Sequence, residues 1–355
     1  MVRTEYYKDL TKMNTFGMKV KARCFIEYDS VADLVDIEFE ELARPVLHIG
    51  GGSNLLFTDD FKGTILHSKI NFIEILEKEE PRHCEEQSDA AISSPVLVSV
   101  GAGVIFDDFC DWAAKEGLWG VENLSYIPGE VGASAVQNIG AYGVEVKDVI
   151  RKVYCYDTVD EEFVNFDVED LEYGYRDSAF KDPEVKGRYI VTHVVFALSR
   201  EPQPRLDYAH LKEAVGENVT PLQIRKTIIK IRKEKLPEPS VMGSAGSFFK
   251  NPVISAEHFA RIEAAAKAEH GADVKVPHYD LPDGTVKIPA AWMIEQCGWK
   301  GKRSGGAAVY DKQPLVIVNY TGEAYPEEII GLERRIIASV KSKFDIVLHP
   351  EVDHI

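Results

Sequence analysis

The chain is short of positive charge. It carries 41 Lys and Arg against 58 Asp and Glu, which gives a formal net charge of −17 at pH 7. Proteins that grip nucleic acid need a basic field to neutralise the phosphate backbone. We therefore expect no nucleic-acid partner, although a local basic patch could still hold an anionic ligand.

Paired cysteines and metal-binding motifs are also missing. The five cysteines are odd in number, scattered and never in C-x-x-C spacing: Cys24, Cys84, Cys110, Cys155 and Cys297. The ten histidines form no H-E-x-x-H pair. Disulfide frameworks and zinc sites usually show one of these patterns. The sequence predicts neither a disulfide framework nor a bound metal.

No long hydrophobic run is present. No apolar segment approaches the roughly 18 residues that a membrane helix needs. The opening residues, MVRTEYYKDL, are polar and lack the apolar centre of a signal peptide. We expect a soluble, cytoplasmic protein with no membrane partner.

Apolar residues make up 45% of the 355 residues, which is enough for two or three folded domains. Charged and polar residues at 78–95 predict an exposed loop or insertion. Period-two alternation predicts strands near 20–26 and over much of 149–200, and short apolar runs predict strands at 45–49, 96–104 and 314–320. Apolar residues at helical spacing predict helices at 30–42, 106–116, 220–235, 254–269, 290–296 and 327–343.

The most unusual stretch is IPGEVGASAVQNIGAYG, residues 127–143. It contains four glycines and three alanines, and no charged side chain lies between Glu130 and Glu145. Glycine lets the backbone approach a ligand closely, and its N–H groups stay accessible. Gln137 and Asn138 add amide donors and acceptors. This composition favours a surface for something flat or charged, with a plain tight turn as the alternative.

A second glycine-rich segment, GGGSN at 50–54, follows a predicted strand. It is not a Walker A loop, and it lacks the third glycine of the G-x-G-x-x-G fingerprint. A glycine triplet alone is weak evidence, because many are ordinary turns. Together with the stretch at 127–143, it predicts a pair of segments that hold a dinucleotide.

Three further features are candidates for chemistry. Arg176 stands among tyrosines, although an Arg beside Asp177 is more often a surface pair. Ser244 and Ser247 lie among glycines with no histidine nearby, so either is better suited to donating a proton or a hydrogen bond than to nucleophilic attack. The predicted helix at 220–235 carries six basic residues against one acid, as a solvated face or as a phosphate-binding edge.

Seven segments, in this order along the chain, resemble the UDP-N-acetylenolpyruvoylglucosamine reductase family. They are NTFG (14–17), GGGSN (50–54), IPGEVGASAVQNIGAYG (127–143), YGYRDSAFK (173–181), KLPEP (235–239), GSAGSFFKNP (243–252) and HPEV (349–352). No segment would be sufficient alone, but the ordered set covers nearly the whole chain and is specific.

The resemblance implies an α+β fold: a two-subdomain FAD-binding fold of the PCMH/vanillyl-alcohol-oxidase type, plus a C-terminal α+β substrate-binding domain. The expected boundaries are 1–72 for FAD-binding subdomain 1, with the tail 346–355 returning to the active site. Residues 73–236 are expected to form FAD-binding subdomain 2, and residues 237–345 the substrate-binding domain.

The resemblance also implies a noncovalent FAD cofactor, and NADPH as the electron donor. The residues expected to bind the flavin are Gly50, Gly51, Gly52, Ser53, Asn54, Pro128, Gly129, Gly132, Ala133, Ser134, Gln137, Asn138, Gly140, Ala141, Tyr142, Gly143 and Arg232.

The implied reaction makes UDP-N-acetylmuramate for peptidoglycan from the small-molecule substrate UDP-N-acetylglucosamine enolpyruvate. Hydride from the reduced flavin reaches the enolpyruvyl group, and Ser247 supplies the final proton. Arg176 and Glu351 act at the reacting carboxylate. Tyr208, Lys235 and Asn251 are expected to bind substrate, and the enzyme is expected to be a monomer.

One departure from the family pattern is Asp353, at a position where the family often has a basic residue. Two alternatives remain open. One is another flavoenzyme of the same superfamily, which often tethers its flavin through His or Cys; neither residue occurs in the two glycine-rich segments. The other is a UDP-sugar-binding module without catalysis, which would not need Arg176, Ser247 and Glu351 together.

Overall fold

A computed structural model describes residues 1–76, 94–208 and 210–355 of the chain. The insertion predicted at 78–95 lies outside the described residues, except for 94 and 95. The chain forms two compact units. Unit 1 comprises Met1–Lys8, Lys21–Gly52 and Phe61–Glu234, and unit 2 comprises Asp9–Val20, Ser53–Asp60 and Lys235–Ile355. The expected division into three domains stays a prediction.

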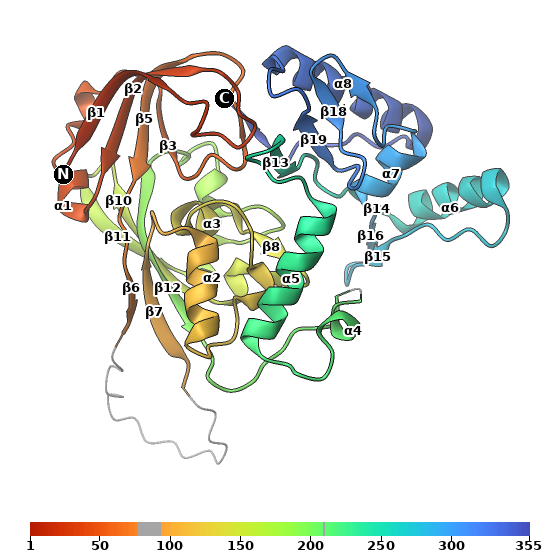
Figure 1. Ribbon diagram of the computed structural model, residues 1–355, viewed down its shortest axis with the longest axis horizontal. Helices are drawn as coiled ribbons and strands as arrows, with labels where there is room; N and C mark the ends of the chain where they lie inside the picture. The colour runs from red at the N-terminus through yellow and green to blue at the C-terminus, as the bar shows by residue number, and fades with distance from the viewer. Residues whose placement is uncertain (77–93, 209) are drawn as a thin grey trace. The chain divides into compact units, whose positions relative to one another are not determined.

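The first sheet of unit 1 has the order β1-β2-β5-β3 (Figure 1). Its strands are β1 (Arg3–Asp9), β2 (Lys21–Tyr28), β5 (Phe61–Ser68) and β3 (Val46–Ile49). Both β2 and β3 run parallel to β5, the central strand. From Gly63 onward β5 is buried on both faces, as strands of parallel sheets usually are. This sheet leads the chain directly into the first glycine-rich segment.

The helix predicted at 30–42 is shorter in the structure. Ser30 caps α1 (Val31–Val35) by accepting a hydrogen bond from the Asp33 N–H, as the sequence predicts. The chain then breaks at Asp36 and resumes as η1, a single 3-10 turn at Phe39–Glu41. Ile37 is buried at the break, so packing outweighs the helical pattern there.

The second sheet of unit 1 is antiparallel and has the order β11-β10-β12-β7-β6. Its strands are β6 (Ile73–Ile75), β7 (Val96–Gly101), β10 (Ile150–Asp157), β11 (Glu162–Asp167) and β12 (Tyr189–Leu198). The predicted strands at 96–104 and within 149–200 are confirmed. The short helix α3 (Val131–Gln137) packs on β12 and β7 of this sheet. The second glycine-rich stretch, which contains α3, is therefore supported by the sheet.

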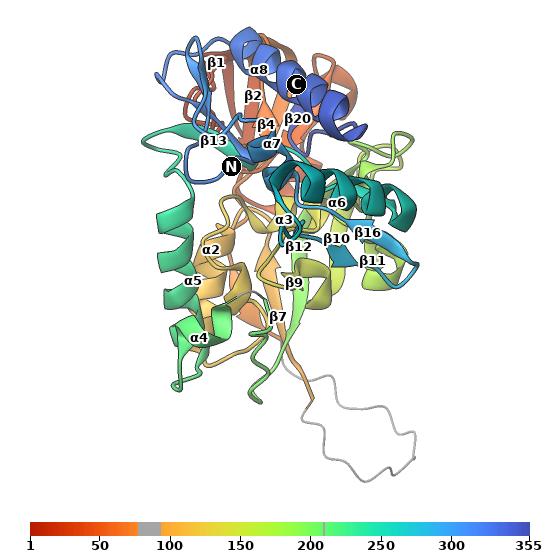
Figure 2. The ribbon, with the colours of Figure 1, turned by 90° about the vertical axis from the view of Figure 1, so that its right-hand side faces the viewer.

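Two longer helices, α2 (Phe106–Lys115) and α5 (Pro221–Lys235), lie side by side in both views (Figures 1 and 2). Arg225 of α5 joins them through Asp107 and Asp111 of α2. Both helices agree with their predicted ranges within one residue. The remaining elements of unit 1 are α4 (Leu211–Val215), β8 (Gly140–Ala141), β9 (Val144–Glu145), η2 (Glu122–Leu124), η3 (Val146–Asp148), η4 (Val168–Leu171) and η5 (Ala179–Lys181).

Unit 2 is built on a sheet of order β13-β19-β18-β17, with α8 (Pro326–Phe344) packed on β18 and β19. The strands are β13 (Gly243–Ser247), β17 (Arg303–Ser304), β18 (Ala307–Val309) and β19 (Val316–Asn319). A smaller sheet joins β14 (Val253–Ser255), β16 (Thr285–Lys287) and β15 (Tyr279–Asp280), beside α6 (Ala256–His270). The helices α6, α7 (Ala290–Gln296) and α8 confirm the predictions at 254–269, 290–296 and 327–343.

The C-terminal segment of unit 2 pairs with a strand far away in sequence. Strand β20 (Asp353–His354) runs parallel to β4 (Leu55–Leu56), and Ile355 accepts a hydrogen bond from the Thr58 N–H at 2.8 Å. Glu351 therefore lies just before a strand that is fixed to the segment following Asn54. In the described part of the chain, no helix has the length and apolar character needed to span a bilayer.

Candidate functional site

The two glycine-rich segments meet inside unit 1. Gly50–Gly52 directly follow β3, and Gly51 lies against Gly129, since a Cβ built on Gly51 would be 3.5 Å from the Gly129 Cα. A Cβ on Gly50 would come within 3.0 Å of the Ala133 Cβ. The Gly50 contact is tighter than most Cβ contacts, whereas the Gly51 contact is of ordinary length, so Gly50 is the position where a missing side chain matters most. The folded chain thus brings together the two segments that the sequence pairs.

The second segment contains a helix where the sequence suggested loop. Residues Val131–Gln137 form α3, with Val131 and Ala135 fully buried. Gly132 lies against the β7–α2 turn, where an added Cβ would be 2.9 Å from the Ala102 Cβ. Asn138 then ends the helix in the left-handed region at φ 44°. Close packing on the sheet overrides the low helix propensity of glycine.

Several of the expected cofactor residues use their side chains to shape this stretch. Ser134 is buried, and its hydroxyl donates to the Val131 carbonyl at 2.7 Å. Asn138 is also buried and donates to the Gly174 carbonyl at 2.7 Å. Gln137 accepts a hydrogen bond from Lys181 at 2.8 Å. These contacts hold the backbone of the stretch in place, and direct contact with a flavin stays a prediction for all three residues.

Arg176 is tied to the same stretch. Its Nη1 donates to the Asn138 carbonyl at 3.1 Å, and its Nη2 donates to the Gly140 carbonyl at 2.6 Å. Its backbone is left-handed, at φ 56°, which is unusual for a residue other than glycine. Asp177 instead accepts from the Ser178 N–H. The guanidinium is therefore fixed beside the second glycine-rich segment by two main-chain carbonyls.

A partly buried arginine lies near the stretch. Arg232 of α5 donates from Nε to the Tyr126 carbonyl at 3.0 Å, and burial lowers the pKa of this guanidinium. Burial also raises the pKa of the Tyr142 hydroxyl, against the opposing charge and hydrogen bond of Arg232. The Tyr142 and Tyr208 rings meet edge to face, with centroids 5.8 Å apart. Arg225, by contrast, is neutralised by two aspartates, so the basic residues of α5 do not form one uniform surface.

Unit 2 brings the segments of Ser247 and Glu351 together. Ser247 ends β13 opposite Val316, and the chain continues along the C-terminal tail through a bridge between Phe249 and Pro350. The Glu351 N–H donates to the Phe248 carbonyl at 2.8 Å. Asn54 donates to the Glu351 carbonyl at 3.0 Å. Ser247 is partly buried and Ser244 is almost fully buried, which makes Ser247 the more accessible of the two serines.

The expected substrate residues lie in both units. Asn251, in unit 2, accepts a hydrogen bond from the Ala290 N–H at 2.9 Å and so supports the start of α7. Lys235 is the last residue of α5. Tyr208, in unit 1, is 44% exposed. Nothing in these contacts opposes a role in binding, and for each of the three that role stays a prediction.

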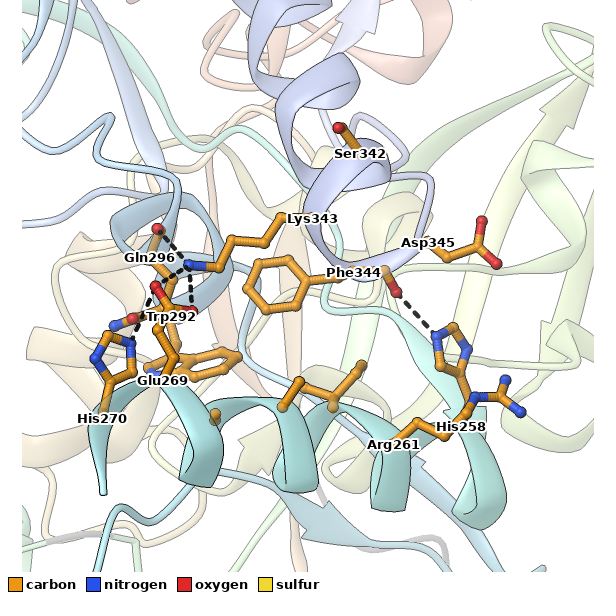
Figure 3. A pocket seen from close by; sticks show the side chains of 13 residues that line it. His258, Arg261, Glu269, His270, Trp292, Gln296, Ser342, Lys343, Phe344 and Asp345 are labelled. Carbon is orange, nitrogen blue, oxygen red and sulfur yellow. Dashed lines mark hydrogen bonds and ion pairs between the residues drawn. The ribbon is translucent and has the colours of Figure 1, made fainter. Parts of the chain in front are cut away.

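A cavity in unit 2 lies apart from these residues. It has a volume of about 330 Å³ and is lined by residues of α6, α7 and α8 and by Asp345 (Figure 3). In it, Lys343 donates to Glu269 at 3.1 Å, and His258 bonds the Phe344 carbonyl at 2.9 Å. None of its lining residues is a predicted site residue. We assign no role to this cavity.

One buried cluster was missed by sequence reasoning. His67 lies between Glu27 and Glu130, at 3.0 Å from each carboxylate. Glu130 is the single acid in residues 127–143, an oddity that could have drawn attention to it. Glu27 and His67, the other two members of the cluster, are far from Glu130 in the sequence, so no spacing pattern could identify them. Among the described residues, no group of three or more His, Cys, Asp or Glu side chains is arranged to hold a metal.

Two family models match the chain. The model described as FAD binding domain matches residues 22–166, and the model described as UDP-N-acetylenolpyruvoylglucosamine reductase, C-terminal domain, matches residues 238–355. The first covers both glycine-rich segments, and the second covers Ser247 and Glu351. The prediction that the chain binds FAD is confirmed.

Curated relatives match over almost the full length. The UDP-N-acetylenolpyruvoylglucosamine reductase of Bacteroides fragilis is 49% identical over 98% of each chain. The enzyme of the same name from Porphyromonas gingivalis is 43% identical over 100% of this chain and 99% of its own. Among solved structures, UDP-N-acetylenolpyruvylglucosamine reductase from Thermus caldophilus superposes with a TM-score of 0.64 at 23% identity, covering 100% of this chain and 98% of that one.

The structural likeness and the FAD-binding model confirm the predicted α+β fold of FAD-binding type. The full-length relatives establish the family as well as the fold, because 43–49% sequence identity over almost the whole chain is well above the level at which family membership is secure. The chain belongs to the UDP-N-acetylenolpyruvoylglucosamine reductase family of FAD-dependent oxidoreductases.

Proposed function

We propose that this chain reduces UDP-N-acetylglucosamine enolpyruvate to UDP-N-acetylmuramate, a step in making peptidoglycan precursors in the cytoplasm. NADPH is the proposed electron donor, and the working form is a monomer. The observation that carries the proposal is the 49% identity, over 98% of both chains, to an enzyme named for this reduction. The presence of Arg176, Ser247 and Glu351 in one chain supports it.

The residues of unit 1 fit a flat, anionic dinucleotide. Gly50 and Gly51 approach Ala133 and Gly129 of the second segment with almost no side-chain bulk, and the partly buried Arg232 supplies a positive charge. FAD, when bound, supplies hydride transfer to and from its ring system. These residues, together with Ser53 and Asn54, are proposed to hold and orient it.

Arg176 is proposed to stabilise negative charge on the substrate. Once hydride reaches the terminal carbon of the enolpyruvyl double bond, negative charge spreads over the neighbouring carbon and its carboxylate. A cation already fixed in place stabilises such charge without having to reorganise. Arg176 meets that requirement, because two main-chain carbonyls hold its guanidinium.

Ser247 is proposed to deliver a proton to the carbon next to the carboxylate, completing addition across the double bond. The Glu351 carboxyl group is proposed to act beside the developing acid, as a protonated or hydrogen-bonded partner. Tyr208, Lys235 and Asn251 are proposed to bind the UDP-sugar. Because Asp353 brings no positive charge, the diphosphate depends more heavily on Lys235 and Tyr208.

An anaerobic titration tests the two half-reactions separately. NADPH should bleach the yellow flavin absorbance, and the enolpyruvyl UDP-sugar should then restore it with formation of UDP-N-acetylmuramate. Bleaching without recovery would reject this substrate and favour another flavoenzyme. Absence of bound flavin, even after FAD is added, would reject the proposed function and favour a binding module.

The proton donor has a matched control within its own strand. Ser247→Ala should leave flavin reduction by NADPH unchanged and slow reoxidation by substrate by about 10²- to 10⁴-fold, as loss of a general acid does. Ser244→Ala, three residues away in β13, should change neither step by more than about twofold, since its buried side chain is assigned no part in proton transfer. Equal rates for the two variants would remove Ser247 from the mechanism.

A further inference from the structure

His67 is a buried histidine that the proposed reaction does not use. It lies on β5 and is only 2% exposed. Its Nδ1 is 3.0 Å from Glu27 Oε1, on the neighbouring strand β2, and its Nε2 is 3.0 Å from Glu130 Oε1. One imidazole therefore bridges two carboxylates inside unit 1.

Glu130 lies where the two glycine-rich segments touch. It is the residue immediately before α3, within the second segment. Its other oxygen, Oε2, would be 3.3 Å from a Cβ built on Gly50, the first residue of the first segment. The Gly50 position also abuts Ala133 of α3. The Glu130 carboxylate thus belongs to the second segment and lies close to the start of the first.

We propose that His67 is a positioning residue for FAD: through Glu130 it fixes the approach of Gly50 to the second glycine-rich segment, so that FAD binding is linked to a proton on its imidazole. The inference rests on the FAD-binding assignment and on no property of the UDP-sugar substrate.

The charges around His67 decide when it is protonated. Burial acts to lower the pKa of His67, but the hydrogen bond and charge of Glu130, joined by the hydrogen bond of Glu27, raise it above its ordinary value, and Lys69 opposes this weakly. Two further groups face the cluster: Arg3 on β1, whose Nε is 3.8 Å from Glu27 Oε2, and His48 on β3, whose pKa burial lowers to about 3. His48 bonds the buried Tyr28 hydroxyl at 2.7 Å. Of these histidines, His67 is the one whose carboxylate partners raise its pKa.

The sign of the linkage follows from the raised pKa. Below that pKa, His67 carries its proton and neutralises part of the charge of Glu27 and Glu130. As pH rises through it, the imidazole becomes neutral and no longer offsets the charge of Glu130, which is buried beside the segments that must receive an anionic cofactor, or that of the partly buried Glu27. FAD binding should therefore weaken with rising pH, and, by reciprocity, FAD should raise the proton affinity of His67.

FAD affinity of the apoprotein measures this without turnover. Flavin fluorescence quenching between pH 6 and 9.5 should give a wild-type Kd that rises by about five- to tenfold, the lower end of typical coupling between two sites. The His67→Gln variant should bind FAD with the weaker affinity that wild type shows at high pH, and its Kd should not change with pH. Visible circular dichroism of the bound flavin should shift in the same way.

Two matched comparisons separate positioning from general damage. Glu130→Gln should flatten the pH profile, whereas Glu27→Gln, which alters the other side of the same imidazole, should keep a slope with its midpoint at lower pH. His193→Gln changes another histidine of unit 1, which is partly buried, stacks on Tyr154 and has no carboxylate partner among the described residues; this variant should behave as wild type.

A flat wild-type profile over this range would overturn the inference even if no variant folds. So would a His67→Gln profile that keeps the wild-type slope, or equal effects of the two glutamate variants. In each of these cases the wild-type protein still binds FAD, so the proposed function stands. Absence of FAD binding by wild type would reject the proposed function as well, and the two failures are therefore distinguishable.

Discussion

Two contacts between histidine and glutamate, one in each unit, go with opposite shifts of the histidine pKa. His67 in unit 1 is 2% exposed, yet its pKa is raised. The His354 side chain in unit 2 is 33% exposed, yet its pKa is lowered, chiefly by burial. The more deeply buried histidine is thus the one that favours its charged form. Burial alone does not decide the charge of a histidine.

The difference lies in the number and geometry of the partners. His67 has two carboxylates at 3.0 Å, one on each ring nitrogen. His354 has one, with Glu333 Oε2 at 3.3 Å from Nε2, and this oxygen makes no hydrogen bond among the described residues. Burial raises the pKa of Glu333 to about 7, so both members of the unit 2 pair move toward their neutral forms. At His67 two carboxylates at hydrogen-bonding distance outweigh desolvation, whereas at His354 the charge of Asp353 does not.

The largest expected effect comes from removing the unit 1 cation. His67→Leu leaves Glu27 and Glu130 facing an apolar group, and breaking such a buried arrangement typically costs about 3 to 5 kcal/mol of unfolding free energy. Urea denaturation of the apoprotein at pH 6, with hydrogen exchange of β2 and β5 as a local probe, measures this cost.

The loss should shrink as pH rises through the raised pKa of His67, because the wild-type imidazole then gives up its proton. His193→Leu serves as the control, because that histidine has no carboxylate to leave unpaired. A loss of unfolding free energy below about 1 kcal/mol in His67→Leu at pH 6 would show that the two glutamates are not held by charge. The contrast between the two histidines would then have no energetic basis.

A smaller effect on stability is expected from Glu333. A salt-bridged acid stabilises a fold at high pH, whereas Glu333 should favour the folded state at low pH. Its pKa rises on folding from 4.5 to about 7, so the folded state holds a proton that the unfolded state has lost between these values. The stability of unit 2 should therefore be highest below about pH 4.5 and fall by about 2 to 3 kcal/mol as pH rises to 7, because each tenfold difference in proton affinity between the two states is worth roughly 1.4 kcal/mol.

Native-state hydrogen exchange of α8 amides across this pH range reads the change locally. Glu333→Gln keeps the shape of the side chain without its charge. It should therefore remove the dependence of unit 2 stability on pH and make unit 2 more stable than wild type at pH 8. Glu327→Gln, at an exposed position of the same helix, should leave the slope in place. An unchanged slope in Glu333→Gln would place the titrating group elsewhere.

Local patterns explain which parts of the fold were predictable. The helices α2, α5, α7 and α8 have apolar residues at helical spacing, and their observed bounds lie within one residue of the predicted ones. The antiparallel strands β10 and β12 form within the predicted range, but β12 is buried on both faces along most of its length and does not alternate. In the helices the same residues that define the pattern form the core, so sequence periodicity and packing agree.

The site was predictable only in part. The glycine-rich composition predicted that two segments would act together, and their contact at Gly51 and Gly129 agrees. The helix α3 was missed, because its stability comes from packing against Ala102 and β12, not from its own residues. Glu27, His67 and Glu130 were missed because three separate elements bring them together. Ordered family motifs supplied the roles of Arg176, Ser247 and Glu351, which composition and spacing could not assign.

The smallest expected effect is the coupling energy between Glu333 and His354 in unit 2. It tests directly whether this pair differs from the His67 cluster in unit 1. A double-mutant cycle between Glu333→Gln and His354→Asn should give a coupling energy of at most about 0.5 kcal/mol at pH 7, because neither partner favours its charged form. The same cycle between Glu130→Gln and His67→Gln should give about 2 kcal/mol or more, within the range for residues in one charged network. Hydrogen exchange of α8 and of β5 reports the two cycles separately. Equal coupling energies would mean that the second carboxylate on His67 is irrelevant, and that some other feature of unit 1 keeps its imidazole charged.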